Sequence, residues 1–134
     1  PTELGLLTNL GTLFLYGNRL TGRIPTELGL LSNLGYLLLD DNKLNGPIPT
    51  ELGLLTNLVT LDLNINKLNG TIPPELGFLS NNLEYLLLEY NDLTGSMPAQ
   101  VCNMLTSEGQ LVHLTADCKE EVQCDEECCT LCYY

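Results

Sequence analysis

Residues 25–31 read Pro-Thr-Glu-Leu-Gly-Leu-Leu, and the same letters recur at residues 1–7 and 49–55. A variant, Pro-Pro-Glu-Leu-Gly-Phe-Leu, occupies residues 73–79, so the four copies begin 24 residues apart. A fixed period of this length is typical of a solenoid, in which each repeat forms one coil and buries its apolar face against the next.

Each unit opens with alternating leucines, as in Leu34, Leu37 and Leu39. The last two share one face of a short strand, because side chains on a strand alternate between faces. A glycine and an Ile-Pro pair later in the unit predict a bend, a second extended segment and then a turn of helix. A buried asparagine, which lies after the leucines and before the glycine, can form hydrogen bonds with backbone groups of its own coil and of the adjacent coil. The expected asparagine ladder is Asn18, Asn42, Asn66 and Asn91.

Written out, the unit is LxxLxLxxNxLxGxIPxxLGxLxN, which resembles the plant-type extracellular leucine-rich repeat from residue 1 to about residue 116. The resemblance implies an α/β solenoid wound as a right-handed superhelix. It also implies a parallel β-sheet on the concave face and 3₁₀ or irregular structure on the convex face.

The two ends of the array differ. We expect residues 1–110 to form repeats, of which the first is partial, and residues 111–134 to form a last strand and a C-terminal cap. The leucines of the first coil, Leu10 to Leu20, have no preceding coil to pack against in this sequence. Because an open end exposes surface that a repeat normally buries, we expect further repeats or another subunit to cover it.

All six cysteines lie near the C-terminal end: Cys102, Cys118, Cys124, Cys128, Cys129 and Cys132. An even number at the point where the solenoid stops predicts a disulfide-stapled cap and an extracellular location, although sequence leaves the pairing open. Their order resembles the cysteine-rich ends of secreted diatom and algal leucine-rich-repeat proteins. A zinc site is the alternative, with ligands drawn from Cys124, Cys128, Cys129, Cys132 and His113.

Composition and charge argue against several classes of function. The formal charge of -12 argues against nucleic acid as a partner, and no apolar run is long enough to span a bilayer. A single histidine, with no phosphate-binding glycine loop or recognisable triad, indicates that the chain is not an enzyme and needs no cofactor. Asp40, Asp41 and Asp62 could be considered for Ca²⁺, but no loop would wrap the ion, so no metal site is expected.

The variable strand positions face solvent in columns across the coils, and they mix aromatic, aliphatic and acidic residues. Such a mixture on a rigid sheet is typical of a recognition surface. The predicted binding residues are Tyr16, Tyr36, Leu38, Asp40, Asp62, Tyr85, Leu87, Glu89, Tyr90 and His113. Elsewhere, Asn69-Gly70-Thr71 is a glycosylation sequon on an exposed turn, so Asn69 is expected to carry a glycan in a secreted eukaryotic protein.

These observations predict a secreted or cell-surface, non-catalytic module that binds protein or polysaccharide through its concave sheet. The resemblance implies the same kind of role. The alternative is a structural extracellular protein that stacks end to end into a filament or wall matrix, which the near-identity of the repeats favours.

Overall fold

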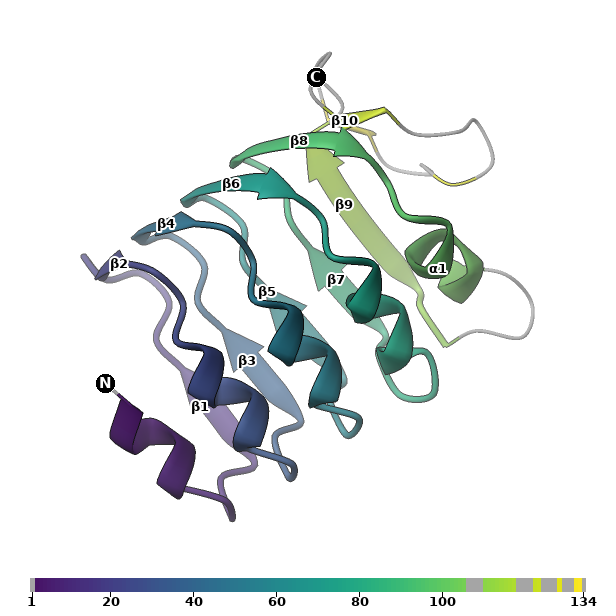
Figure 1. Cartoon of the computed structure of the whole chain (residues 1–134). Coiled ribbons are helices and arrows are strands. Elements are labelled where there is room, and N and C mark those ends of the chain that lie inside the picture. The colour runs from purple at the N-terminus through teal and green to yellow at the C-terminus, as the bar shows by residue number, and fades with distance from the viewer. Residues whose placement is uncertain (1, 106–109, 118–121, 124–127, 129–131, 134) are drawn as a thin grey trace.

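A computed structural model describes residues 2–105, 110–117, 122–123, 128 and 132–133, which wind into a solenoid (Figure 1). One strand from each coil joins a six-stranded parallel sheet, here called the first sheet. Its partners keep the sequence period, since Thr12 pairs with Tyr36 and Tyr36 pairs with Thr60. In order, its strands are β1 (Thr12–Phe14), β3 (Tyr36–Leu38), β5 (Thr60–Asp62), β7 (Tyr85–Leu87), β9 (His113–Asp117) and β11 (Cys132–Tyr133).

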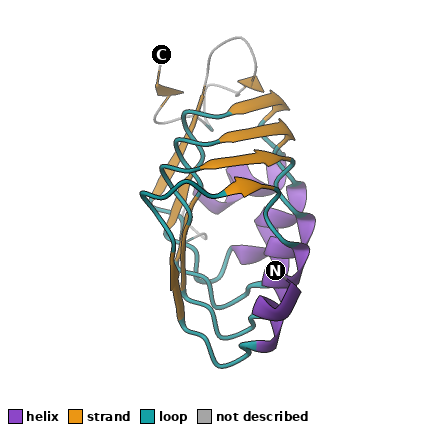
Figure 2. Cartoon of the chain, turned by 90° about the vertical axis from the view of Figure 1, so that its left-hand side faces the viewer, coloured by secondary structure: helices purple, strands orange, loops and turns teal. Residues whose placement is uncertain are grey.

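A second parallel sheet of five strands runs beside the first (Figure 2). Its register is staggered, because Thr21 pairs with Lys43 and Asn45 pairs with Lys67, 22 residues apart rather than 24. Sequence-equivalent residues are therefore not directly opposite each other in this sheet. Its strands, in chain order, are β2 (Thr21–Gly22), β4 (Lys43–Gly46), β6 (Lys67–Thr71), β8 (Asp92–Ser96) and β10 (Val122–Gln123).

Short helices stack on the side of the solenoid away from the first sheet (Figure 2). The residue before each of η2, η3, η4 and α1 is a proline with extended backbone, such as Pro49 with φ -64° and ψ 133°. The elements are η1 (Thr2–Leu6), η2 (Thr26–Leu30), η3 (Thr50–Leu54), η4 (Pro74–Leu79), α1 (Ala99–Cys102) and η5 (Asn103–Leu105). The parallel solenoid with a 3₁₀ convex side, which the resemblance to the leucine-rich repeat implied, is confirmed.

The second extended segment lies slightly earlier than the Ile-Pro pattern indicated. Strand β6 ends at Thr71, immediately before Ile72 and Pro73. Proline has no N–H to donate to a sheet ladder, so the pairing stops before it and the proline instead precedes the 3₁₀ helix.

The core is a stack of layers of leucine side chains, one layer from each coil. Leu34, Leu37, Leu58 and Leu61 are all completely buried, and each contributes roughly 1.5–3 kcal/mol of burial free energy. The exposed positions of the first sheet alternate with these leucines. Packing therefore holds the sheet rigid while leaving its outward side chains free to vary.

Glycine is required for two different reasons, a close approach between neighbouring coils and a bend within a coil. A Cβ added at Gly53 would lie 2.4 Å from the carbonyl oxygen of Glu75 in the next helix, which no side chain could tolerate. Gly46 has a φ of 78°, the left-handed conformation that most residues resist, as the bend after the asparagine requires. The sequence interpretation had assigned a role only to this second kind of glycine.

Candidate functional site

Aromatic side chains form the first column on the concave face of the first sheet. Strand pairing places Tyr36, Thr60, Tyr85 and His113 next to one another on successive coils. Tyr36 is 42% exposed and Tyr85 is 37% exposed. The rings of Tyr85 and His113 stack, with centroids 5.1 Å apart and planes inclined by 16°. The column thus offers flat aromatic surface that already has a fixed orientation.

The second column combines apolar side chains with one carboxylate. Asp62 pairs with Leu38 on one side and with Leu87 on the other. Both leucines are half-buried, as is Asp62 itself. At the two ends of the column, Phe14 on β1 is exposed and Thr115 on β9 is buried. The carboxylate of Asp62 therefore lies between two aliphatic neighbours that displace water from it.

A network of polar groups continues from Asp62 to the residues that come just after the strands of the first sheet, here called the strand exits. The Asn64 backbone N–H donates to Asp62 Oδ1 at 3.1 Å, and Asn64 Nδ2 donates to Glu89 Oε1 at 3.4 Å. The Thr115 hydroxyl donates to Glu89 Oε2. Asn64 Oδ1 is buried and accepts no hydrogen bond from the described residues. The network thus joins two carboxylates and leaves one acceptor unpaired.

The environment of this network disfavours negative charge. Burial raises the pKa of Asp62 to about 6; the hydrogen bond from Asn64 opposes the rise, and the charges of Asp40 and Glu89 add to it. Burial also raises the pKa of Asp40, opposed by a backbone hydrogen bond and increased by the charge of Asp41. Within the part of the chain that the structure describes, no positive partner appears among the causes that shift the pKa of Asp62 or Asp40.

The strand exits hold three side chains in a strained backbone conformation. Asp41, Ile65 and Tyr90 have φ values of 51°, 50° and 58°, whereas the first coil has Gly17 at the equivalent place. For a β-branched residue such as Ile65, this conformation is costly. Ile65 is nevertheless 48% exposed and Tyr90 is 60% exposed. Both therefore present large apolar side chains to solvent at the edge of the concave face.

Asp117 has a structural role that its sequence position did not reveal. Its carboxylate accepts hydrogen bonds from the backbone N–H groups of Tyr90 at 2.8 Å and Asn91 at 2.7 Å. In the preceding coil, the equivalent N–H groups of Ile65 and Asn66 donate to backbone carbonyls instead. Asp117 occupies the position in its unit that Asp40 and Glu89 occupy in theirs, but its carboxylate is engaged with the backbone of the preceding coil.

The asparagines at the exits bridge successive coils. Asn42 Nδ2 donates to the carbonyl of Leu15 at 2.8 Å and to that of its own coil's Leu39 at 3.1 Å, while its Oδ1 accepts from the Leu20 N–H. Asn66 and Asn91 repeat these contacts, and Asn18 bonds within its own coil. They hold the sheet in place and leave ligand contact to the residues before them.

A second asparagine ladder, which sequence reasoning missed, lies before the strands. Asn33, Asn57 and Asn82 each donate to a carbonyl of the preceding coil, at Thr8, Ser32 and Thr56, over 2.7–2.8 Å. Their recurrence, once in each unit at the same place, was a signal that could have identified them.

The cysteine tail is described only in part. Cys102 and Cys128 form a disulfide, which removes Cys128 from the zinc site considered as an alternative. Cys118, Cys124 and Cys129 lie outside the described residues, and only the backbone of Cys132 is described. Within the described residues, no three His, Cys, Asp or Glu side chains are grouped as metal ligands, and this includes Asp40, Asp41 and Asp62.

Two further residues that the sequence singled out lie away from the concave surface formed by β3, β5, β7 and β9. Tyr16 is 55% exposed at the first coil, where its ring lies 6.4 Å from that of Phe14. Asn69 is exposed on β6, in the second sheet, so a group attached to it would leave the concave face uncovered.

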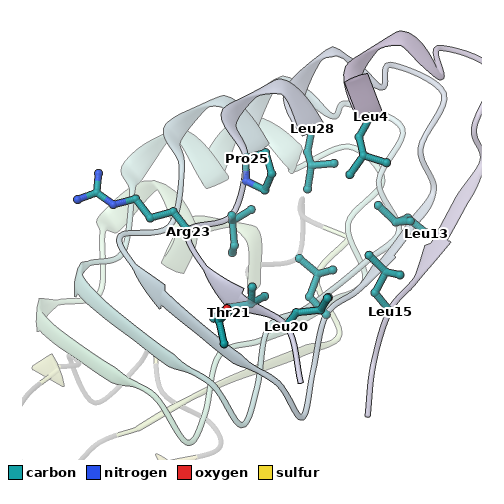
Figure 3. A pocket seen from close by; sticks show the side chains of 11 residues that line it. Leu4, Leu13, Leu15, Leu20, Thr21, Arg23, Pro25 and Leu28 are labelled. Atoms are coloured by element: carbon teal, nitrogen blue, oxygen red, sulfur yellow. The ribbon is translucent and has the colours of Figure 1, made fainter. Parts of the chain in front are cut away.

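The end of the solenoid at the first coil is hollow and apolar (Figure 3). A space of about 200 Å³ is lined by Leu4, Leu13, Leu15 and Leu20, with Leu28 behind them. Leu20 is 38% exposed, whereas its equivalent Leu44 in the next coil is only 6% exposed. The leucine layer of the first coil is therefore covered fully only on the side that faces the second coil.

Comparison with known proteins identifies the repeat. The sequence profile of the family described as Leucine Rich Repeat matches residues 9–31, 33–55, 57–79 and 82–104, which is well over half of the chain. No curated protein matches the sequence significantly. Within the described residues, no helix is long and apolar enough to cross a membrane.

Several solved plant structures are similar, each over 92% of this chain. A plant ice-binding protein is 35% identical with a TM-score of 0.76, and the plant peptide hormone receptor RGFR1, in complex with RGF2, is 36% identical with a TM-score of 0.77. The ectodomain of the Arabidopsis thaliana receptor kinase GASSHO1/SCHENGEN3, in complex with CASPARIAN STRIP INTEGRITY FACTOR 2, is 36% identical with a TM-score of 0.79. The match covers only 38%, 18% and 14% of those chains, respectively. Four matched repeats, the parallel solenoid and this likeness to plant ectodomains show that the chain belongs to the leucine-rich repeat family, in its extracellular form.

Proposed function

We propose that this chain is a non-catalytic recognition module that binds a polypeptide ligand on the concave face of the first sheet. The observation that carries the proposal is the surface formed by Tyr36, Asp62, Tyr85 and His113 on adjacent strands, together with Glu89, which lies two residues after β7. Aromatic rings with nearby hydrogen-bonding groups are the usual anchors of protein interfaces.

The fold alone does not choose the ligand. One similar structure is of an ice-binding protein, whereas two are of receptors in complex with RGF2 and with CASPARIAN STRIP INTEGRITY FACTOR 2. The surface of this chain favours the second kind of partner. Its exposed rings alternate with half-buried carboxylates and leucines, which makes an uneven surface suited to side chains rather than to a flat lattice.

Rigidity makes such a surface effective. The side chains of Tyr36, Tyr85 and His113 lie on paired strands, and each is followed along the chain by a buried leucine. Tyr85 is further held by its stacking on His113. Because little conformational entropy remains to be lost at these positions, more of the contact free energy contributes to affinity.

We further propose that the chain acts outside the cell, as a secreted, surface or wall protein, and that Asn69 is glycosylated. The disulfide between Cys102 and Cys128 supports an oxidising compartment. A glycan on Asn69 would lie on the second sheet, where it would limit unwanted contacts and leave the concave face open.

The test compares ligand binding by two aromatic substitutions. Short peptides and wall polysaccharides are offered to the chain, to Tyr85→Ala and to Phe78→Ala, which removes a 63% exposed ring from the helix side. We expect peptides to bind, Tyr85→Ala to weaken binding about tenfold and Phe78→Ala to leave it unchanged. Equal sensitivity to both substitutions would reject the concave face, and binding of polysaccharides alone would reject the ligand class.

Self-association is the second candidate, and the hollow at the first coil favours it. A coil stacked there, from the same polypeptide or from a second copy, would bury Leu13, Leu15 and Leu20. Light scattering over a range of concentrations tests it. An end-to-end assembly would grow in mass with concentration and would dissociate in Leu20→Asp but not in Leu30→Asp, which alters an exposed leucine on the helix side. A constant monomer mass would reject it.

A further inference from the structure

The concave face carries a concentration of negative charge at its centre. Asp40, Asp62 and Glu89 come from three successive coils, and the charges of the outer two act on the middle one. All three are half-buried. Asn64 links two of them through hydrogen bonds to Asp62 and Glu89. We call these four residues the acidic centre.

No described Lys or Arg shares this surface. Of the five Lys and Arg in the sequence, Arg19 and Arg23 lie on either side of β2, Lys43 and Lys67 begin β4 and β6, and Lys119 lies outside the described residues. The four described ones therefore belong to the second sheet or its flanks. Burial, and to a smaller extent the charges of Asp40 and Glu89, disfavour the ionised form of Asp62 and raise its pKa.

The acidic centre also has an unused hydrogen-bond acceptor. Asn64 Oδ1 is buried and has no donor among the described residues. Buried polar atoms without partners are rare in native proteins, because each one costs free energy. Asn64 Oδ1 itself is closed to solvent, so a donor from a partner would reach the lone pairs of the half-buried Asp62 and Glu89 carboxylates beside it rather than this oxygen.

Apolar groups border the acidic centre on both sides. Tyr36 and Tyr85 lie along the strands on one side, whereas Ile65 and Tyr90 lie at the strand exits on the other. Both of the latter keep a strained backbone while exposing large side chains. A ligand matching this arrangement carries a positive, hydrogen-bond-donating head on an apolar stem, and the side chains of Arg and Lys have this form.

Resting on the proposed function, we propose that the ligand is an extended cationic segment of a partner protein, whose Arg or Lys side chain occupies the acidic centre. A guanidinium group fits best, because it can bond two carboxylates at once and can also stack on Tyr85 or Tyr36. A bare metal ion fits less well, because no three described ligand side chains are grouped around one point. Net charge adds long-range attraction, since the chain carries a formal charge of -12.

The experiment is a selection of displayed random peptides on the intact chain, followed by calorimetry on the enriched sequences. Four variants are compared: Asp62→Asn, Glu89→Gln, Tyr85→Ala and Glu3→Gln. The last one removes an exposed carboxylate from η1, so it has the same effect on net charge as Glu89→Gln. We expect enriched peptides to be rich in Arg or Lys. Asp62→Asn and Glu89→Gln should each weaken their binding roughly tenfold, the usual effect of losing one charged hydrogen bond.

The possible outcomes separate this inference from the proposed function. Enriched peptides that lack basic residues, and that depend on Tyr85 but not on Asp62, would overturn the cationic ligand and leave the concave face standing. An equal loss in Glu3→Gln and Glu89→Gln would attribute the attraction to net charge and would also overturn it. Binding that none of the concave substitutions affects would reject both. Thermal melts of each variant show whether a loss of binding reflects unfolding.

Discussion

Asp117 Oδ1 accepts a hydrogen bond from the Tyr90 backbone N–H at 2.8 Å, while its second oxygen accepts one from Asn91. One coil earlier, the Ile65 N–H donates to the Glu89 carbonyl at 3.0 Å. A side chain of the β9 coil thus substitutes for a backbone carbonyl. Both N–H groups keep an acceptor at this strand exit, although the first sheet itself continues from β9 to β11.

Replacing Asp117 with alanine should therefore destabilise the chain. Two backbone N–H groups would lose their acceptors, and each such loss costs about 1–3 kcal/mol when water cannot replace the acceptor fully. The measurement is the free energy of unfolding in denaturant. Asp117→Asn, which keeps one acceptor oxygen, should fall between the two. An alanine variant as stable as the original chain would contradict this capping role.

Stability should increase as the pH is lowered toward 4. Asp62 has a pKa of about 6 in the folded state and about 3.9 in the unfolded state, so between these values the folded state binds more protons. Its contribution is complete below the unfolded pKa and is lost as the pH rises through about 6. Melting temperatures measured from pH 4 to pH 7 test this.

The matching substitutions assign that effect to its source. Asp62→Asn should melt higher than the original chain at pH 7 and should flatten the pH dependence, because the amide cannot ionise. Asp92→Asn removes an exposed carboxylate from β8 and should leave the dependence in place. A profile that Asp62→Asn does not alter would show that other groups produce it.

Relieving the backbone strain at Ile65 should stabilise the fold and weaken binding. Asparagine tolerates a φ near 50° far better than a β-branched residue, so Ile65→Asn should gain roughly 1 kcal/mol of unfolding free energy. Ile65→Val keeps the branch and should gain nothing. Calorimetry against a selected peptide completes the test. A variant that is both more stable and an equally good binder would leave the strain without a function.

All six cysteines should be oxidised in protein from its natural source, although only the pair Cys102–Cys128 is described. Intact mass after alkylation without reductant should show no added groups. Because the described bond joins residues 26 apart, Cys102→Ser with Cys128→Ser should cost about 3 kcal/mol by the chain-entropy account. Two or more alkylated thiols would contradict full oxidation, and co-purifying zinc would restore the metal alternative.

Asn69 should carry an N-glycan in protein from its natural source. The residue is exposed on β6 and begins the sequon with Gly70 and Thr71. Peptide mapping with and without glycosidase measures its occupancy. Peptides with unmodified Asn69 throughout would argue against passage through the secretory route or against access to this strand.

Several parts of this fold follow from local patterns. A period of 24 residues, with leucines two apart and an asparagine after them, was enough to predict the coil, its short strand and the columns of outward-facing side chains, whereas the parallel first sheet was implied by the resemblance to the leucine-rich repeat. The division between repeats and cap stays a prediction, because residues 106–109 and most of 118–134 lie outside the described part. The role of Asp117 had no signal, since an aspartate in a column of outward residues looks like any other.

What the sequence by itself determined is therefore whatever repeats: the leucine core, the asparagine ladder and the order of side chains within each column. Their physical basis is local, because strand alternation and turn chemistry act within one unit. Only the tertiary structure decided how neighbouring units meet. The 22-residue stagger of the second sheet, the contact of Gly53 with the next helix and the convergence of Asp62, Asn64 and Glu89 all depend on the spacing and twist between coils. Such relations arise from packing between segments more than twenty residues apart, where no pattern within one unit can express them.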